Sequence, residues 1–139
     1  MKYVYVLWIG FFSMLLLVTA QAGEITPEHI AGTTKVTADD VIDLVDKFDD
    51  LLIIDARTAA DYEKGHISDS INLSNVDTNE ASLAKIIPKK TTPVVFYCNG
   101  IKCGRSVKSC QVAVAAGYKN IYWMRGGIAE WKENGYPIE

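Results

Sequence analysis

The sequence predicts an α/β domain in which helices cover both faces of a parallel sheet. Short apolar segments typical of buried strands alternate along the chain with segments of helical period. No internal repeat or low-complexity tract interrupts this alternation. With 139 residues, 49% of them hydrophobic, the chain suffices for one ordinary core. Strands separated by helices favour a parallel sheet. Because the connecting helices pack on the sheet, we expect both of its faces to be covered.

Residues 1–22 are predicted to be a leader that precedes this domain. Lys2 is their only charge, the stretch that follows is almost wholly apolar, and Ala20-Gln21-Ala22 has the small-x-small pattern of a signal-peptidase site. We expect cleavage after this pattern, which leaves residues 23–139 as a single domain. The alternative is an uncleaved anchor over residues 4–20, because the apolar run approaches the roughly 20 residues that span a bilayer. Both interpretations predict an exported, periplasmic or otherwise extracytoplasmic domain that meets a membrane only if the leader remains.

The elements of the domain are expected in a fixed order. Thr26-Pro27 can open one helical turn, and Thr37 is a typical N-cap for a helix over residues 38–48. The remaining predictions are a strand over 51–54, a helix over 60–64 stopped by Gly65, a strand over 70–73, a helix over 79–87 stopped by Pro88, a strand over 94–97, a helix over 105–116 with Gly117 after it, a strand over 121–124 and a helix over 127–134.

Three polar segments follow predicted strands, and parallel strands place such segments at one edge of the sheet. They are Asp55-Ala56-Arg57, Cys98 to Arg105 and Arg125-Gly126-Gly127. This edge would gather four cations, which are Arg57, Lys102, Arg105 and Arg125. The alternative is that each arginine pairs with a nearby carboxylate, such as that of Asp55 or Asp61.

The overall charge of the chain is negative, which makes a local group of cations more informative. Removal of residues 1–22 takes away one of 14 basic residues and no acidic one, so 13 basic residues face 17 acidic ones, for a net charge of −4. This balance argues against nucleic acid as a partner. The cations at the predicted edge therefore indicate a site for a small anion.

The three cysteines, Cys98, Cys103 and Cys110, lie close together, whereas a disulfide scaffold would distribute its bridges along the chain. Cys98 follows a strand and precedes a loop in which Gly100 and Gly104 allow backbone N–H groups to turn inward. The next helix starts near Arg105, so its N-terminal dipole also faces the loop. Both effects favour a thiolate and a bound anion.

Three spaced motifs resemble those of the rhodanese-like sulfurtransferases. IIDARTAADYEKGHISDSINL (53–73) is similar to the first signature of that family, VVFYC followed by Arg105-Ser106 to its active-site segment, and AAGYKNIYWMRGGIAEWKENGYP (115–137) to its C-terminal signature. The resemblance implies a three-layer fold with a central parallel sheet. It also implies a thiosulfate:cyanide sulfurtransferase-like enzyme without a cofactor, in which Cys98 takes sulfur from a thiosulfate-like donor, forms a persulfide and passes the sulfur to a thiol or cyanide.

The resemblance also assigns the neighbouring residues of the site. The N–H groups from Asn99 to Gly104 would cradle the terminal sulfur, while Arg105 and Lys102 would neutralise the anion. The substrate-binding residues are therefore predicted to be Asn99, Gly100, Ile101, Lys102, Gly104, Arg105 and Ser106, with Asp55, Arg57 and Arg125 in support. His66 is interpreted as structural, because sulfur transfer from a thiolate needs no base.

The loop is longer than the family pattern, which leaves the donor open. Arg105 stands seven residues after Cys98, whereas typical single-domain members place this arginine nearer to the nucleophile. In the wider superfamily, short loops go with sulfur, and slightly longer ones with phosphatases and arsenate reductases. Thiosulfate is therefore not the only donor to consider.

Cys103 distinguishes this loop, and its role has several interpretations. It can attack a Cys98 persulfide and release sulfide, cycle with Cys98 as a dithiol and disulfide, or pack beneath the loop. Cys110 is expected in the core. Zinc is not expected, because the cysteine spacing is not that of paired ligands and His29 and His66 are distant in sequence. Three hypotheses follow: a persulfide-forming sulfurtransferase, a thiol redox protein or oxyanion reductase using Cys98 and Cys103, and a non-catalytic binding module.

Overall fold

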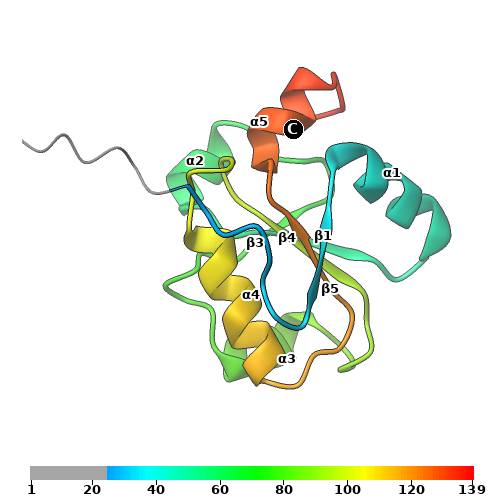
Figure 1. Ribbon diagram of the computed structural model, residues 1–139, viewed down its shortest axis with the longest axis vertical. Coiled ribbons are helices and arrows are strands. Elements are labelled where there is room, and N and C mark those ends of the chain that lie inside the picture. The colour runs from blue at the N-terminus through cyan, green and yellow to red at the C-terminus, as the bar shows by residue number, and fades with distance from the viewer. Residues whose placement is uncertain (1–24) are drawn as a thin grey trace, which may run out of the picture.

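The architecture is a parallel sheet between two layers of helices, seen in a computed structural model that describes residues 25–139 (Figure 1). Five strands hydrogen-bond in the order β1-β5-β4-β2-β3, and every pairing is parallel. The strands are β1 (Thr33–Val36), β2 (Leu52–Asp55), β3 (Ile71–Asn72), β4 (Val94–Tyr97) and β5 (Ile121–Met124). The predicted α/β class is confirmed. The predicted leader over residues 1–22 lies outside the described residues.

The helices divide between the two faces of the sheet, as the alternation along β4 shows. Val94 and Phe96 pack in one apolar cluster, and Val95 and Tyr97 pack in the other. The first cluster includes residues of α3 (Glu80–Ile86) and α4 (Arg105–Ala115), and the second includes residues of α1 (Ala38–Lys47) and α5 (Gly127–Glu133), while the short α2 (Ala59–Glu63) buries no residue fully. The three-layer arrangement implied by the resemblance is therefore present.

Helix starts follow the sequence closely, with one informative exception. The Thr37 side chain accepts the Asp40 N–H and the Asp40 carboxylate accepts the Thr37 N–H, which forms a capping box for α1. At α4, by contrast, the N-cap is Gly104 and no side chain caps the helix. The first N–H groups of α4 are therefore open to the loop that precedes it.

The N-terminal part of the domain differs from the prediction. β1 (Thr33–Val36) was not predicted, because two of its three polar residues are exposed and its apolar content is low. Its single neighbour in the sheet is β5, so it is an edge strand. The helical turn predicted at Thr26-Pro27 is wrong, since no helix forms there.

Among residues 25–139, no helix has the length and apolar character that crossing a bilayer would need.

Candidate active site

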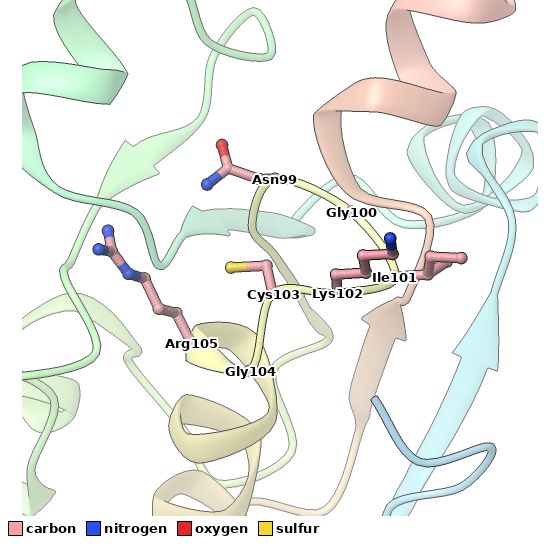
Figure 2. Close-up of a pocket in the computed structure, with 7 residues that line it drawn as sticks. All are labelled: Asn99, Gly100, Ile101, Lys102, Cys103, Gly104 and Arg105. Atoms are coloured by element: carbon pink, nitrogen blue, oxygen red, sulfur yellow. The ribbon is translucent and has the colours of Figure 1, made fainter. Parts of the chain in front are cut away.

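An open cavity of about 590 Å³ lies at the carboxyl end of β4, in the loop that leads into α4 (Figure 2). It is lined by Asn99, Gly100, Ile101, Lys102, Cys103, Gly104 and Arg105. The residues predicted from the sequence to bind the substrate are thus brought together, except Ser106, which is buried behind the cavity. Cys98 does not line the cavity.

Cys98 lies beneath the loop, next to the start of α4. It follows Val94 and Phe96 on the face of β4 that α4 covers, and it is 1% exposed. Its Sγ atom accepts the Ser106 N–H at 3.4 Å and lies 3.1 Å from Ser106 Oγ. The Cys103 carbonyl oxygen is 3.0 Å from the same sulfur. Two groups that can donate and one acceptor therefore surround this thiol.

Trp123 orients the Ser106 hydroxyl. Its indole Nε1–H donates to Ser106 Oγ at 3.0 Å. The serine oxygen thus accepts from the indole, which leaves its own hydrogen for the Cys98 sulfur. Sequence reasoning missed Trp123, although its place two residues after Ile121 puts it on the face of β5 that α4 covers. A buried tryptophan usually finds a partner for its N–H, and that was the available signal.

The surroundings of Cys98 favour its protonated form. The hydrogen bond to Cys103 raises the pKa of Cys98, burial raises it further, and the Ser106 groups oppose both effects. The carbonyl oxygen of Cys103 acts in the same direction, because it presents a negative dipole to the sulfur. In this arrangement, Cys98 is a neutral thiol.

Cys103 has the opposite character. It is partly exposed, and Figure 2 shows its sulfur turned toward the space between the side chains of Asn99 and Arg105. The pKa of Cys103 is lowered to about 5, chiefly by its hydrogen bond with the Cys98 thiol; burial opposes this, and the N–H groups of Asn99 and Arg105 and the charge of Arg105 add to the lowering. The two thiols therefore titrate as one pair, which carries a single proton at neutral pH. The cysteines of the described chain are not joined by disulfides.

The beginning of the loop is fixed by α5. The N–H of Ile128 donates to the Cys98 carbonyl at 2.9 Å, and that of Ala129 donates to the Asn99 carbonyl at 3.1 Å. This close approach depends on Gly127, whose φ is +60° and where a Cβ atom would overlap the Cys98 carbonyl oxygen. Within the loop, the Cys103 N–H donates to the Gly100 carbonyl at 2.9 Å, so the cradle predicted from all the N–H groups between Asn99 and Gly104 is wrong for this one.

The tip of the loop is fixed by the segment that precedes β1. The N–H and Oγ1 of Thr26 both donate to the Ile101 carbonyl, at 2.8 and 2.7 Å. Thr26 is held in turn by Arg125, whose Nη2 donates to the Thr26 carbonyl at 2.8 Å and whose Nη1 lies 3.0 Å from Glu28. Sequence reasoning missed Thr26, because nothing local marks a residue that acts 75 positions away.

Only two of the four predicted cations line the cavity, Lys102 and Arg105. Arg105 Nη1 lies 3.7 Å from an oxygen of Asp61 and has no hydrogen-bond partner among the described residues. Arg125 is engaged with the N-terminal segment, as described above. The four-cation edge predicted from the sequence is therefore wrong for Arg57 and Arg125, and the alternative of carboxylate pairing holds for both.

Arg57 belongs to a buried network beside the site. It pairs with Asp55 at 2.7 Å, and Arg57 Nη2 also donates to the Gly65 carbonyl at 2.8 Å. The Tyr97 hydroxyl donates at 2.6 Å to Asp55 Oδ2, the oxygen that Arg57 Nη2 also contacts, and lies 3.1 Å from Ser70 Oγ. Both charged side chains are at most 5% exposed. Asp55 and Arg57 thus fix the end of β2 against that of β4 and do not reach the cavity.

The other predicted structural residues lie away from the cavity. His66 stacks on Tyr62 with ring centroids 3.6 Å apart, and its Nε2 lies 3.5 Å from Glu139. Cys110 is fully buried in the core, and burial raises the pKa of its thiol. Among residues 25–139, no cluster of three or more histidine, cysteine or acidic residues is arranged to hold a metal ion.

Comparison with known families and relatives gives one consistent result. The Rhodanese-like domain family model matches residues 37–134. A sulfurtransferase of Allochromatium vinosum is 32% identical over 90 residues, which cover 65% of this chain and 79% of that protein. A tRNA uridine(34) hydroxylase of Yersinia pestis is 32% identical over 111 residues, or 73% of this chain, but this match spans only 30% of the hydroxylase.

Solved structures show the same fold at lower identity. The BH2092 protein of Bacillus halodurans has a TM-score of 0.68 and 22% identity, with 76% of each chain covered. A thiosulfate sulfurtransferase of Pseudomonas aeruginosa has a TM-score of 0.66 and 22% identity over 77% of this chain and 20% of that one.

Proposed function

The chain belongs to the rhodanese-like domain family, and from this premise we propose that it is a sulfurtransferase that carries sulfur as a persulfide on Cys98. The observation that supports this most directly is the setting of Cys98, which directly follows β4 and contacts both the N–H and the oriented hydroxyl of Ser106. Hydrogen-bond donors of this kind stabilise a Cys98 thiolate once another group has accepted its proton.

The substrates that we propose are a small anionic sulfur donor and a thiol or cyanide acceptor. Arg105 and Lys102 line the cavity and provide its positive charge, which attracts an anionic donor. The Cys103 sulfur now lies between Asn99 and Arg105 (Figure 2), and the N–H groups of these two residues favour a negative charge there by lowering the pKa of Cys103. We call this place the sulfur seat. A persulfide on Cys98 would put its outer sulfur there, next to Cys98 itself.

The donor of this reaction is either thiosulfate or a larger persulfide. The cavity is open and measures about 590 Å³, which exceeds what a thiosulfate ion needs. Two donors should therefore be compared, thiosulfate and glutathione persulfide. With cyanide as the acceptor, the wild-type protein should form thiocyanate from at least one of them under reducing conditions. Intact mass after exposure to the donor alone should rise by about 32 Da, the mass of one sulfur atom. No gain in mass and no thiocyanate with either donor would contradict the proposal.

A second function, thiol redox cycling, is favoured by the close approach of the two cysteines. The Cys98 thiol donates to the Cys103 carbonyl oxygen at 3.0 Å, and the four residues between the cysteines include Gly100. Attack of the Cys103 thiolate on an oxidised Cys98 would join them as a disulfide. Mild oxidation should then lower the intact mass by two hydrogens, and a protein that keeps both hydrogens would exclude this function.

A further inference from the structure

The question left open by the proposed function is which of the two thiols meets the sulfur donor. Cys103 lines the open cavity together with Lys102 and Arg105, whereas Cys98 is 1% exposed and does not line it. A donor that enters with its anionic end toward Arg105 therefore reaches the Cys103 sulfur first. The Cys98 sulfur is covered, because the Cys103 carbonyl oxygen lies 3.0 Å from it.

The charges of the site support the same order. At neutral pH the negative charge of the thiol pair is on Cys103, since its pKa is lowered to about 5 while that of Cys98 is raised. The thiolate is the nucleophilic form of cysteine. Cys103 thus combines exposure, ionisation and a neighbouring cation, and Cys98 has none of these three properties in the same arrangement.

We propose that Cys103 is the catalytic residue that receives sulfur from the donor and that it passes this sulfur to Cys98. The proposal rests on the proposed function and adds the path of the sulfur atom. With thiosulfate, the Cys103 thiolate attacks the outer sulfur and the sulfur–sulfur bond of the donor breaks. Sulfite leaves with the bonding electron pair, and Cys103 becomes a persulfide anion.

The second step moves the sulfur inward. Cys98 attacks the outer sulfur of the Cys103 persulfide, a new bond forms to Cys98, and the bond to the Cys103 Sγ atom breaks. The Cys98 proton goes to Cys103, which ends as a neutral thiol, so charge, protons and electrons balance without any oxidant or reductant. The Cys98 thiol already donates to the Cys103 carbonyl oxygen at 3.0 Å, so its proton lies on the side of the sulfur that faces Cys103.

The geometry also accounts for the space that a Cys98 persulfide needs. The Cys103 sulfur occupies the sulfur seat while it is a thiolate, held by the N–H groups of Asn99 and Arg105. Once Cys103 is protonated, those N–H groups stabilise its position less, because they favour an anion. Rotation of Cys103 into the cavity vacates the seat for the outer sulfur of the Cys98 persulfide.

The test compares single-cysteine substitutions in the full chain. The donor is thiosulfate or glutathione persulfide, whichever transfers sulfur to the wild-type protein faster. Stopped samples should be analysed by intact mass and by peptide mapping. In Cys98→Ser, we expect the gain of about 32 Da to persist and to map to Cys103. In Cys103→Ser and in Cys103→Ala, loading of Cys98 should slow by roughly a hundredfold, because the receiving thiolate is gone. Cys110→Ala is the control for an unrelated cysteine and should load as wild type does.

The outcomes separate this proposal from the function on which it rests. If wild type loads but Cys98→Ser takes up no sulfur, the donor reacts with Cys98 directly and the relay is wrong. The same conclusion follows if Cys103→Ala loads as fast as wild type or faster. A wild-type protein that takes no sulfur from either donor would overturn the proposed function and the relay together.

Discussion

Two buried polar clusters lie at the carboxyl ends of neighbouring strands, and they are built on opposite principles. At the end of β2, the charges of Asp55 and Arg57 neutralise each other and are bonded further by Tyr97 and a backbone carbonyl. At the end of β4, the pair of Cys98 and Cys103 carries one negative charge beside the half-buried Arg105.

The Asp55–Arg57 cluster contributes to stability, whereas the cysteine pair contributes reactivity. The first cluster satisfies its members internally and leaves nothing for a ligand, so it fixes the relative position of two strand ends. The second holds a protonated Cys98 next to an ionised Cys103 and leaves a guanidinium nitrogen of Arg105 without a hydrogen-bond partner among the described residues. A substitution can therefore disrupt one cluster and leave the other intact.

The largest effect is expected at the reactive cluster. Cys98→Ser should lower steady-state transfer of sulfur to cyanide by at least about a hundredfold, because the Cys98 carrier is lost and only the Cys103 persulfide remains to react. Thermal stability should change little, since the substitution is nearly isosteric. Thiocyanate formation measures the first quantity and a melting curve the second. Turnover in Cys98→Ser equal to that of wild type would remove Cys98 from the reaction.

The next largest effect is expected at the closed cluster. Asp55→Asn leaves the Arg57 guanidinium buried without its counter-charge, which should reduce the free energy of unfolding by about 3 kcal/mol. Asp61→Asn is the matched control, because the Asp61 carboxylate is exposed and 3.7 Å from Arg105. That change should cost less than about 0.5 kcal/mol. Urea denaturation compares the two variants, and equal losses would contradict the distinction between the clusters.

The pH dependence of alkylation tests the interaction between the two thiols, because the pKa of Cys103 is lowered chiefly by Cys98. Reaction of Cys103 with iodoacetamide should rise through a midpoint near pH 5, because its folded pKa is about 5 and the thiolate is present above that value. In Cys98→Ala the leading cause of the lowered pKa is removed, so the midpoint should move to higher pH. At pH 6, alkylation should then slow by roughly tenfold or more. An unchanged midpoint would show that the two thiols do not interact.

Arg105→Gln tests the charge that the reactive cluster presents to an anion. The variant should raise KM for an anionic donor by roughly tenfold, or about 1.4 kcal/mol, and leave the unfolding free energy nearly unchanged. Lys119→Gln serves as a control, because this exposed cation does not line the cavity. If both variants raise KM equally, net charge and not Arg105 is responsible.

The smallest effect is expected from the anchor of the loop tip. Thr26→Val removes the hydroxyl that donates to Ile101 but keeps the backbone N–H bond. Loss of one such hydrogen bond is worth about 1 kcal/mol, so turnover should fall by roughly fivefold. Thr26→Ser restores the hydroxyl and should recover the activity. A serine variant that is as slow as the valine variant would mean that the methyl group, and not the hydrogen bond, matters.

The sequence predicted most of the sheet and the helices because their signals are local. The bounds of β4 and β5 agree residue for residue, and α4 and α5 differ by one residue at their ends. β1 was missed because an edge strand of low apolar content resembles a loop. Strand β3 is shorter than predicted, as only Ile71 and Asn72 pair with β2.

The site was predicted in its parts but not in its internal arrangement. The residues of the loop follow from their place between a strand and a helix, and they line the cavity as expected. The contacts of Trp123 and Thr26 depend on elements far away in the chain, so no local pattern indicates them. Arg57 and Arg125 do not line the cavity for the same reason, since an arginine pairs with whichever carboxylate the fold brings near.

The anchoring of the loop from both ends of the domain has a consequence for folding. Thr26 holds Ile101 from the N-terminal side, and Ile128 holds Cys98 from the C-terminal side. These contacts span long stretches of chain, so they form only when the whole domain has closed. An unfinished chain therefore presents ordinary thiols of high pKa, and the reactive thiolate arises last. The lowered pKa of Cys103 is therefore a property of the completed fold and not of the loop sequence alone.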